Sequence, residues 1–399
     1  MATATYRSVL LDTAHGAVEA VGRDAGVAAH YGDPLREQRS LIRGQAVVDL
    51  SHFGVLTVEG PDRLSWLTTL SSQVLTNLDP GDSAETLFLS VQGRVEFAPH
   101  VVDDGTRSWL IVEAHELQPL HEWLDRMRFA LRVEVVDRSN DVAVVGAVQV
   151  PEHVEAASAR LAADHKGQLS ASTDSGAPLV WVDPWPGVVH GGWAYSSTPD
   201  HPAQHYSWHQ VLVARDDLTE IFAGPAADGL ALSGIWAAEA LRIEAWRPRA
   251  GTEVDDRTVP HELDWLRTAV HLEKGCYKGQ ETVARVHNLG HPPRRLTFLD
   301  VDGSEHTVPP AGAEVVLDGR VVGRVTAAQL HHEAGPIALA VIKRAVDPTA
   351  QLTVRVPRSD VEPIEDHAAE QWAATQIVVV PPDAGQTVQR PKGFLRGPR

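Results

Sequence analysis

The chain has 399 residues, 43% hydrophobic and 22% charged, which suits a globular protein of two or three domains. Thirty-five basic residues stand against 53 acidic ones, and the net charge of −18 disfavours direct binding to nucleic-acid backbones. A signal-peptide core and an apolar run of membrane-spanning length are both lacking, so we expect a cytoplasmic protein without membrane contacts. A single cysteine excludes an internal disulfide.

The first 150 residues combine short strands with single helices. A helix is expected near residues 30–50, with Pro34 at its start, followed by a strand over 55–59. Pro61 opens a second helix, and a third is expected over 115–129. Further short strands are expected at 88–89, 95–97 and 109–112. Strands mixed with single helices in this way predict an α+β fold and not a doubly wound sheet.

The middle of the chain is more helical. We expect a helix over 151–163, a surface loop over 164–176, and a long helical stretch over 217–246 that is interrupted at its glycines. Arg242 and Glu244 lie two apart in that stretch, so they face different sides of the helix and their plain interpretation is a solvated charge pair.

Two histidines raise the question of a metal site. His205 and His209 are four residues apart and would share one face of a helix. Pro202 interrupts the approach, however, and the glutamate of a zinc-protease motif does not follow. We therefore predict no metal site at these histidines.

The composition changes at residues 291–293, His-Pro-Pro. Five short β runs follow at regular spacing and predict a small β-barrel or sandwich over 291–357. The remaining segment, 358–399, is polar and proline-rich, and we expect a disordered tail there. Residues 1–290 then form the larger region, which we expect to contain two interleaved subdomains.

The most informative stretch is Lys274-Gly275-Cys276-Tyr277-Lys278-Gly279-Gln280-Glu281, which holds the only cysteine. Residues 280–287 are expected to form a short helix that ends near Gly290, so Cys276 should lie on a tight turn before a helix N-terminus. There the free N–H groups, the helix dipole and two ammonium groups would favour a thiolate. A lone cysteine is usually an inert core residue, but these polar and glycine neighbours are poor core material. We therefore expect a functional thiol.

The pattern Lys-Gly-Cys-Tyr-x-Gly-Gln-Glu resembles the signature of the YgfZ family of folate-binding proteins, relatives of the glycine-cleavage aminomethyltransferase (T-protein). The resemblance covers about residues 30–357. It implies aminomethyltransferase-like folate-binding domains, a C-terminal β-barrel, and tetrahydrofolate or another folate derivative as ligand. It also implies a role in iron–sulfur cluster assembly or repair, together with client or assembly proteins, and an indirect effect on iron–sulfur enzymes that modify tRNA.

In this family resemblance Cys276 is the key thiol. One thiolate does not hold a cluster alone, because clusters are usually held by four cysteines, so any ligation is transient or shared with a partner. The resemblance assigns the surrounding site loop to Lys274, Gly275, Tyr277, Lys278, Gly279, Gln280 and Glu281.

The folate contacts are also implied by resemblance. Residues 241–245, Leu-Arg-Ile-Glu-Ala, are similar to the family segment whose glutamate contacts the pterin ring, which assigns Glu244 and Arg242 to the ligand. A carboxylate can accept two N–H bonds from an aminopyrimidine edge. Arg285, on the helix after the cysteine turn, is assigned to the same ligand.

Two other hypotheses remain open. The Gln-Gly-Arg-Val hairpin at 92–95 is similar to that of the aminomethyltransferases, yet Glu96-Phe97 replaces their paired aspartates and Glu113 stands at the place of an asparagine. A tetrahydrofolate-dependent aminomethyltransferase with Glu96 as its base is therefore the second hypothesis, weakened by the longer side chain. The third is a non-catalytic scaffold. We favour an assembly factor over an enzyme.

Overall fold

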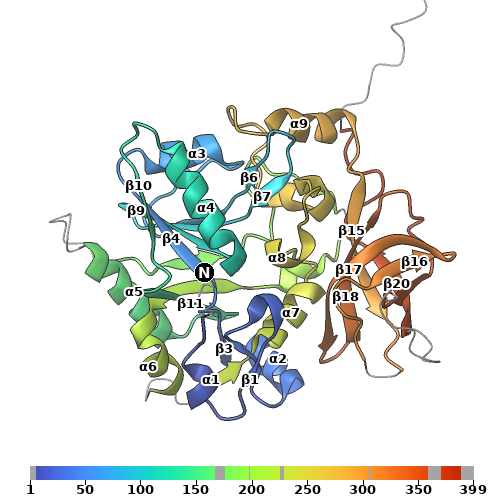
Figure 1. The fold of residues 1–399 in the computed structure, drawn as a ribbon, viewed down its shortest axis with the longest axis horizontal. Helices are drawn as coiled ribbons and strands as arrows, with labels where there is room; N and C mark the ends of the chain where they lie inside the picture. The colour runs from blue at the N-terminus through green and yellow to red at the C-terminus, as the bar shows by residue number, and fades with distance from the viewer. Residues whose placement is uncertain are drawn as a thin grey trace, which may run out of the picture.

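The computed structural model describes residues 6–166, 176–196, 198–224, 229–304, 307–357 and 370–387. Two lobes of mixed sheet and helix lie beside a C-terminal barrel, and a mostly irregular segment with short helices connects the three (Figure 1). The predicted α+β class with a C-terminal β-barrel is confirmed.

The first lobe is built on a sheet whose strands come from distant parts of the chain. The strand order is β12 (Val180–Val182), β13 (His209–Ala214), β11 (Val142–Ala147), β3 (Ala46–Asp49) and β14 (Ala231–Ser233). Helices α5 (Glu152–Lys166) and α6 (Leu218–Ala223) cover one face, and α2 (Pro34–Ile42) and α7 (Ile235–Glu244) cover the other. Burial on both faces explains why β11 is a continuous run of small apolar residues.

The second lobe is an antiparallel sheet. Its strand order is β10 (Glu134–Asp137), β4 (Gly54–Glu59), β9 (Arg107–Val112), β8 (His100–Asp103) and β5 (Ser83–Glu85). Helices α3 (Arg63–Leu70) and α4 (Ala114–Met127) pack on its outer face. Residues of its inner face, among them Val102, Trp109 and Ile111, share one core with Val144 and Leu212 of the first lobe. The two sheets therefore enclose a common interior.

The smaller elements complete these lobes. The N-terminal segment contributes α1 (Leu10–Thr13), β1 (Val18–Glu19), the 3-10 turn η1 (Gly22–Asp24) and β2 (Ala28–His30), and a hairpin joins β6 (Phe88–Leu89) to β7 (Val95–Phe97). The 3-10 turns η2 (Pro202–His205) and η3 (Arg215–Asp217) flank β13 of the first lobe, and the connecting segment holds α8 (Ala250–Glu253), η5 (Pro260–Leu263), η6 (Trp265–Arg267) and α9 (Gln280–Leu289).

The barrel is closed by a strand that the sequence prediction missed. Its order is β15 (Arg294–Val301), β18 (Gly335–Lys343), β17 (Arg320–His331), β16 (Glu314–Leu317), β19 (Leu352–Arg355) and β20 (Gln371–Val378), and β20 pairs with both β19 and β15. The barrel therefore extends beyond the predicted boundary at residue 357, and the tail prediction is wrong for 371–378. The rest of the predicted tail, 358–369 and 388–399, lies outside the described residues.

The reason for this error is the weak pattern of β20. Only Trp372, Ala374 and Gln376 are buried, in strict alternation with exposed residues. One of the three is polar and one is small, so the strand carries little hydrophobic signal of its own and depends on pairing with two neighbours.

A second correction concerns the helical stretch predicted over 217–246. The structure divides it into α6, strand β14 and α7, and β14 pairs in parallel with β3. Three residues of edge strand between two glycines are too short for a periodic signal, so tertiary pairing decides their conformation. Among the described residues, we find no helix long and apolar enough to cross a membrane.

Candidate functional site

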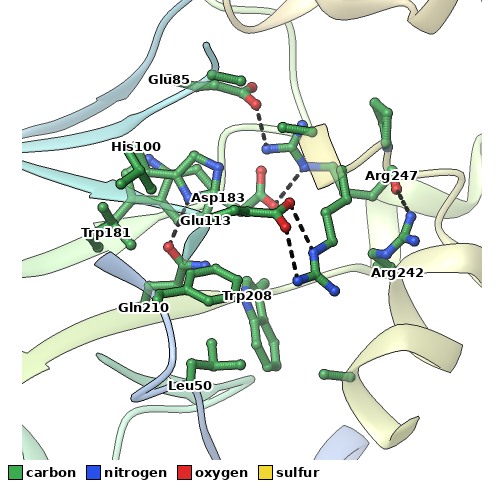
Figure 2. Close-up of a pocket in the computed structure, with 18 of the residues that line it drawn as sticks. Leu50, Glu85, His100, Glu113, Trp181, Asp183, Trp208, Gln210, Arg242 and Arg247 are labelled. Carbon is green, nitrogen blue, oxygen red and sulfur yellow. Dashed lines mark hydrogen bonds and ion pairs between the residues drawn. The ribbon is translucent and has the colours of Figure 1, made fainter. Parts of the chain in front are cut away.

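A cavity of about 80 Å³ lies between the two lobes, where the sheets face each other. Five aromatic side chains line it: Trp181, Trp208, Tyr206, Trp265 and Phe53. Figure 2 shows that charged side chains enter the same space from several elements. Aromatic side chains together with convergent polar groups are typical of a site for a small ring compound.

Three buried arginines carry the positive charge around this cavity. Arg242 forms a two-pronged pair with Glu239, at 2.7 Å for both bonds, and a third bond of 3.1 Å with Glu253. Arg249 pairs with Asp24 at 2.6 Å and with both carboxylate oxygens of Glu113 at 3.1 Å. These contacts link η1, the start of α4, α7 and α8 into one network.

The third arginine, Arg247, follows α7 in the chain, and its carbonyl accepts a hydrogen bond of 2.9 Å from Arg242. Its Nε donates to Asp183 at 2.9 Å and its Nη2 donates to Glu85 at 2.8 Å (Figure 2). His100 stacks on Trp181 with 3.7 Å between ring centroids. Arginine–carboxylate pairs therefore surround the cavity, with Arg242 and Arg249 sharing Glu239 while Arg247 has separate partners.

Burial and charge set the protonation of the carboxyl groups. Burial opposes ionisation of Glu113, but the charge of Arg249 and the N–H of Gly251 outweigh it and lower the pKa of Glu113. At Asp183, burial dominates over the charge of Arg247 and raises the pKa to about 6. Burial and the charge of Glu113 together raise the pKa of Glu116 to about 8. The carboxyl of Glu116 is thus protonated at neutral pH, whereas that of Glu113 is ionised.

The structure separates the two folate residues predicted on α7. Arg242 is buried and lines the central cavity, but Glu244 projects from another face of the helix and its side chain is 48% exposed. Glu244 lines a second pocket of about 260 Å³ with His205 and Tyr206, and its carboxylate lies 3.3 Å from Nε2 of His331 in the barrel. The two side chains line different pockets because helix residues two apart point in different directions, and their assignment to one ligand stays a prediction.

We predict that Glu244→Gln has a small effect on stability, below about 1 kcal/mol, because the pair with His331 is half exposed. The nearby His331 side chain lowers the pKa of Glu244 below its usual 4.5, despite partial burial. A depressed carboxyl pKa contributes stability above 4.5 that is lost as the pH falls through the folded-state pKa. Urea unfolding of both proteins should therefore differ at pH 7 and converge below pH 4.5; a constant difference would contradict the prediction.

The second candidate region is the loop around Cys276. Cys276 is exposed and free, and it lies between Gly275 and a buried Tyr277. Gly279 has a left-handed backbone, with φ of 84°, and caps α9, which ends at Leu289. The predicted turn before a helix N-terminus is therefore present.

The two ammonium groups of the loop have hydrogen-bond partners in distant parts of the chain. Nζ of Lys274 donates to the backbone carbonyls of Thr68, Ser71 and Gln73, at the C-terminal end of α3. Burial lowers the pKa of Lys274 to about 8. Nζ of Lys278 instead pairs with Glu96 of the β7 strand at 3.0 Å. Both lysines therefore bind distant segments and fasten the loop.

The other residues of the loop divide into anchors and exposed side chains. The side-chain amide of Gln280 donates to the carbonyl of Lys274 at 3.1 Å, which closes the turn. Glu281 and Arg285 are exposed on α9, and neither lines the central cavity. Cys276 does not line it either. The structure thus presents a cysteine loop and a buried cavity as two distinct places.

Three further sequence expectations can be compared with the structure. Glu96 is at the surface in its pair with Lys278 and does not line the cavity, whereas Glu113 does. His205 ends η2 and His209 begins β13, so the helix face that they were considered to share does not exist.

Sequence reasoning missed most of the cavity. Its charged residues Glu85, Asp183, Glu239 and Arg247 come from widely separated parts of the chain, and Asp24 joins them only through its pair with Arg249. No local motif connects them. One sequence signal could have pointed to them, the run Trp246-Arg247-Pro248-Arg249-Ala250, in which two arginines stand among apolar residues. Arg247 is buried there, and a buried arginine requires acidic partners.

Comparison with known proteins shows that the chain is similar in sequence to aminomethyltransferases. It is 29% identical to the aminomethyltransferase of Symbiobacterium thermophilum over 320 residues, 74% of this chain and 77% of that protein. Over 367 residues, 86% of this chain and 91% of the other, it is 27% identical to the aminomethyltransferase of Streptomyces coelicolor. A putative chloroplastic transferase of Arabidopsis thaliana is 27% identical over 284 residues, 71% of this chain and 61% of that protein.

The fold agrees with these relatives. The structure superposes on the crystal structure of the glycine cleavage system aminomethyltransferase T from Bartonella henselae with a TM-score of 0.66, covering 95% of this chain and 98% of the other at 17% identity. No family model matches the chain. With a shared fold and similar sequence over most of its length, the chain is a relative of the aminomethyltransferases, within the superfamily that includes the glycine-cleavage T-protein.

Proposed function

We propose that the protein binds tetrahydrofolate or another reduced folate and supports iron–sulfur cluster assembly or repair through Cys276, as a YgfZ-type factor in the cytoplasm. Its partners would be iron–sulfur client or assembly proteins, and its effect on enzymes that modify tRNA would be indirect. The observation that carries the proposal is the loop itself: an exposed cysteine held by a lysine that binds three carbonyls, by a buried tyrosine and by a capping glycine.

This arrangement favours a functional thiol over a packing residue. An inert cysteine is normally buried among apolar neighbours, whereas Cys276 is exposed while Lys274 and Tyr277 on either side are fixed. Fixed neighbours hold the position of the sulfur without occupying it. A cluster or a sulfur intermediate would be cargo and not a resident group, because one thiolate leaves the other cluster ligands to a partner.

The central cavity supports the folate part of the proposal. Aromatic side chains offer flat walls for a pterin ring, and the carboxylates of Glu113 and Glu239 offer acceptors for its N–H groups. Two buried donors on the same cavity, Nη1 of Arg247 and Nε1 of Trp265, have no partner among the described residues. A bound folate would supply a carrier for one-carbon groups.

A tetrahydrofolate-dependent aminomethyltransferase is the second candidate, because relatives bearing that name match most of the chain. The position of Glu96 speaks against it. A general base must lie within hydrogen-bond reach of the proton that it removes, and Glu96 is instead paired with Lys278 at the surface. A scaffold that binds no folate is the third candidate, which a direct binding measurement addresses.

The test is complementation of a strain that lacks its own YgfZ-type protein, with an iron–sulfur enzyme activity as readout. We predict that wild type restores the activity and that Cys276→Ala restores less than a tenth of it. Because the side chain is exposed, Cys276→Ala should unfold at the temperature of wild type and bind tetrahydrofolate equally well. Full rescue by Cys276→Ala would remove the thiol from the function.

A parallel assay separates the second candidate. The purified protein is mixed with tetrahydrofolate and an aminomethyl-loaded carrier protein of the glycine-cleavage type, and methylenetetrahydrofolate is measured. The assembly-factor proposal expects no turnover above background with wild type. Turnover that disappears in Glu96→Gln and persists in Cys276→Ala would establish the transferase in its place.

A further inference from the structure

Two hydrogen-bond donors of the central cavity are left without acceptors. Trp265 is 1% exposed and Arg247 is 4% exposed, and both line the cavity. Within the described part of the chain, neither Nε1 of Trp265 nor Nη1 of Arg247 has a hydrogen-bond partner. The neighbouring indoles differ, because Trp181 donates to the carbonyl of Ala84 and Trp185 to that of Ala245.

Such donors require an explanation. Buried N–H groups are nearly always paired, and an unpaired one carries a desolvation cost of about 1–3 kcal/mol. The other two nitrogens of Arg247 each donate to a carboxylate, Nε to Asp183 and Nη2 to Glu85, and these carboxylates fix the guanidinium and the direction of its free Nη1. Both Arg247 and Trp265 border the cavity, and an acceptor placed within reach of both would satisfy both donors.

The same cavity also offers the complementary chemistry. Glu113 and Glu239 line it and are ionic acceptors. A matching ligand therefore presents both N–H groups and an oxygen acceptor on a planar ring that can pack against aromatic side chains. The 2-amino-4-oxo pyrimidine edge of a pterin has this combination, because its carbonyl oxygen accepts while its amino and ring N–H groups donate.

We propose that Arg247 and Trp265 donate to the carbonyl oxygen at C4 of a pterin ring, and that this pair makes the cavity select 4-oxo over 4-amino pteridines. The inference rests on the proposed binding of folate and adds the residues that read the ring. A 4-amino analogue presents N–H groups where the two donors need an acceptor, so binding it leaves donors facing donors. Sites built to hydrogen-bond a polar group discriminate strongly against analogues that lack it.

The experiment measures dissociation constants by calorimetry for tetrahydrofolate and for its 4-amino analogue. Wild type should prefer the 4-oxo compound by at least about tenfold, the effect of one unpaired buried donor. Trp265→Phe keeps an aromatic ring in place and removes the donor, so it should weaken tetrahydrofolate binding by about fivefold or more and leave the 4-amino analogue unchanged or tighter-bound. Both effects bring the ratio of the two dissociation constants closer to one.

A matched control removes an indole N–H elsewhere. Trp66 donates to the carbonyl of Met127 in the core of the second lobe and does not line the cavity, so Trp66→Phe should retain the wild-type ratio. A wild-type ratio near one, with tetrahydrofolate bound, would overturn the inference and leave folate binding intact; a water molecule would then be the acceptor. Equal weakening of both ligands by Trp265→Phe would also overturn it. Failure of wild type to bind either compound would overturn the proposed folate function itself.

Discussion

Replacing Arg249 by methionine should lower the free energy of unfolding by about 3–5 kcal/mol, which is the usual cost of removing one partner from a buried ion pair. Among the described residues, Arg249 is the one arginine that pairs with both Asp24 and Glu113, and it also reaches Glu239 at 3.2 Å. Methionine has a similar length but removes the guanidinium, so Asp24 and Glu113 lose their arginine partner while Glu239 keeps Arg242. Chemical denaturation at pH 7 measures the loss.

The pH dependence of the unfolding free energy provides a second test of the Arg249→Met variant. The charge of Arg249 outweighs burial and lowers the pKa of both Asp24 and Glu113. Carboxyls with depressed pKa values stabilise the fold at neutral pH, and this stability is lost as the pH falls through their folded-state values. The gap between wild type and Arg249→Met should therefore be largest near pH 7 and shrink in acid.

The control is an arginine of the same kind at the surface. Arg132 forms a two-pronged pair with Asp62, but its side chain is 73% exposed, so Arg132→Met should not measurably change the unfolding midpoint. If the two variants behaved alike, the buried network would not have the energetic weight that its geometry suggests.

The local parts of the fold were predictable because their signals are local. Pro34 marks the first turn of α2, and the glycine at residue 279 marks the start of α9. The loop around Cys276 belongs to the same class, since a turn residue, a helix start and a helix stop lie within sixteen residues. Where a strand depends on its neighbours, as in β14 and β20, the sequence carried little of the information.

The candidate site shows the same division. Arg242 was predicted at the ligand and lines the cavity. Its partner Glu239 is three residues away on the same helix, whereas Glu253, eleven residues away, is brought to it by the turn between α7 and α8, which sequence separation does not predict. The lysines beside Cys276 were expected to act on the thiol. Their real partners are carbonyls of α3 and a carboxylate of β7, roughly two hundred residues away in the chain, which spacing alone does not indicate.

Two glycines near Cys276 should differ in how they tolerate substitution by alanine, because Gly279 is tightly packed and Gly275 is not. A Cβ at Gly279 would lie 2.5 Å from the carbonyl oxygen of Ser90 and 2.9 Å from Cα of Gly93, and the backbone φ of 84° disfavours any side chain. Both obstacles are backbone atoms of the β6–β7 hairpin and cannot rotate away. We expect Gly279→Ala to cost about 2–4 kcal/mol, from the left-handed conformation plus overpacking.

Gly275 is the matched control, because it flanks the same cysteine without these constraints. A Cβ at Gly275 would meet nothing within 4 Å, so Gly275→Ala should leave stability within about 0.5 kcal/mol of wild type. The functional readouts should separate in the same way. Gly279→Ala displaces the hairpin from α9 and should reduce rescue in the complementation assay below that of Gly275→Ala, even though both variants retain Cys276.

The comparison decides whether the position of the thiol matters or only its presence. If Gly279→Ala were less stable yet rescued as well as wild type at a permissive temperature, Cys276 would act from a freely moving loop, and the anchors at Lys274 and Tyr277 would serve folding alone. If rescue fell while tetrahydrofolate binding in the cavity persisted, the sulfur would have to be held in place by the hairpin contact. Because Cys276 and the cavity are separate places, these two measurements report on them independently.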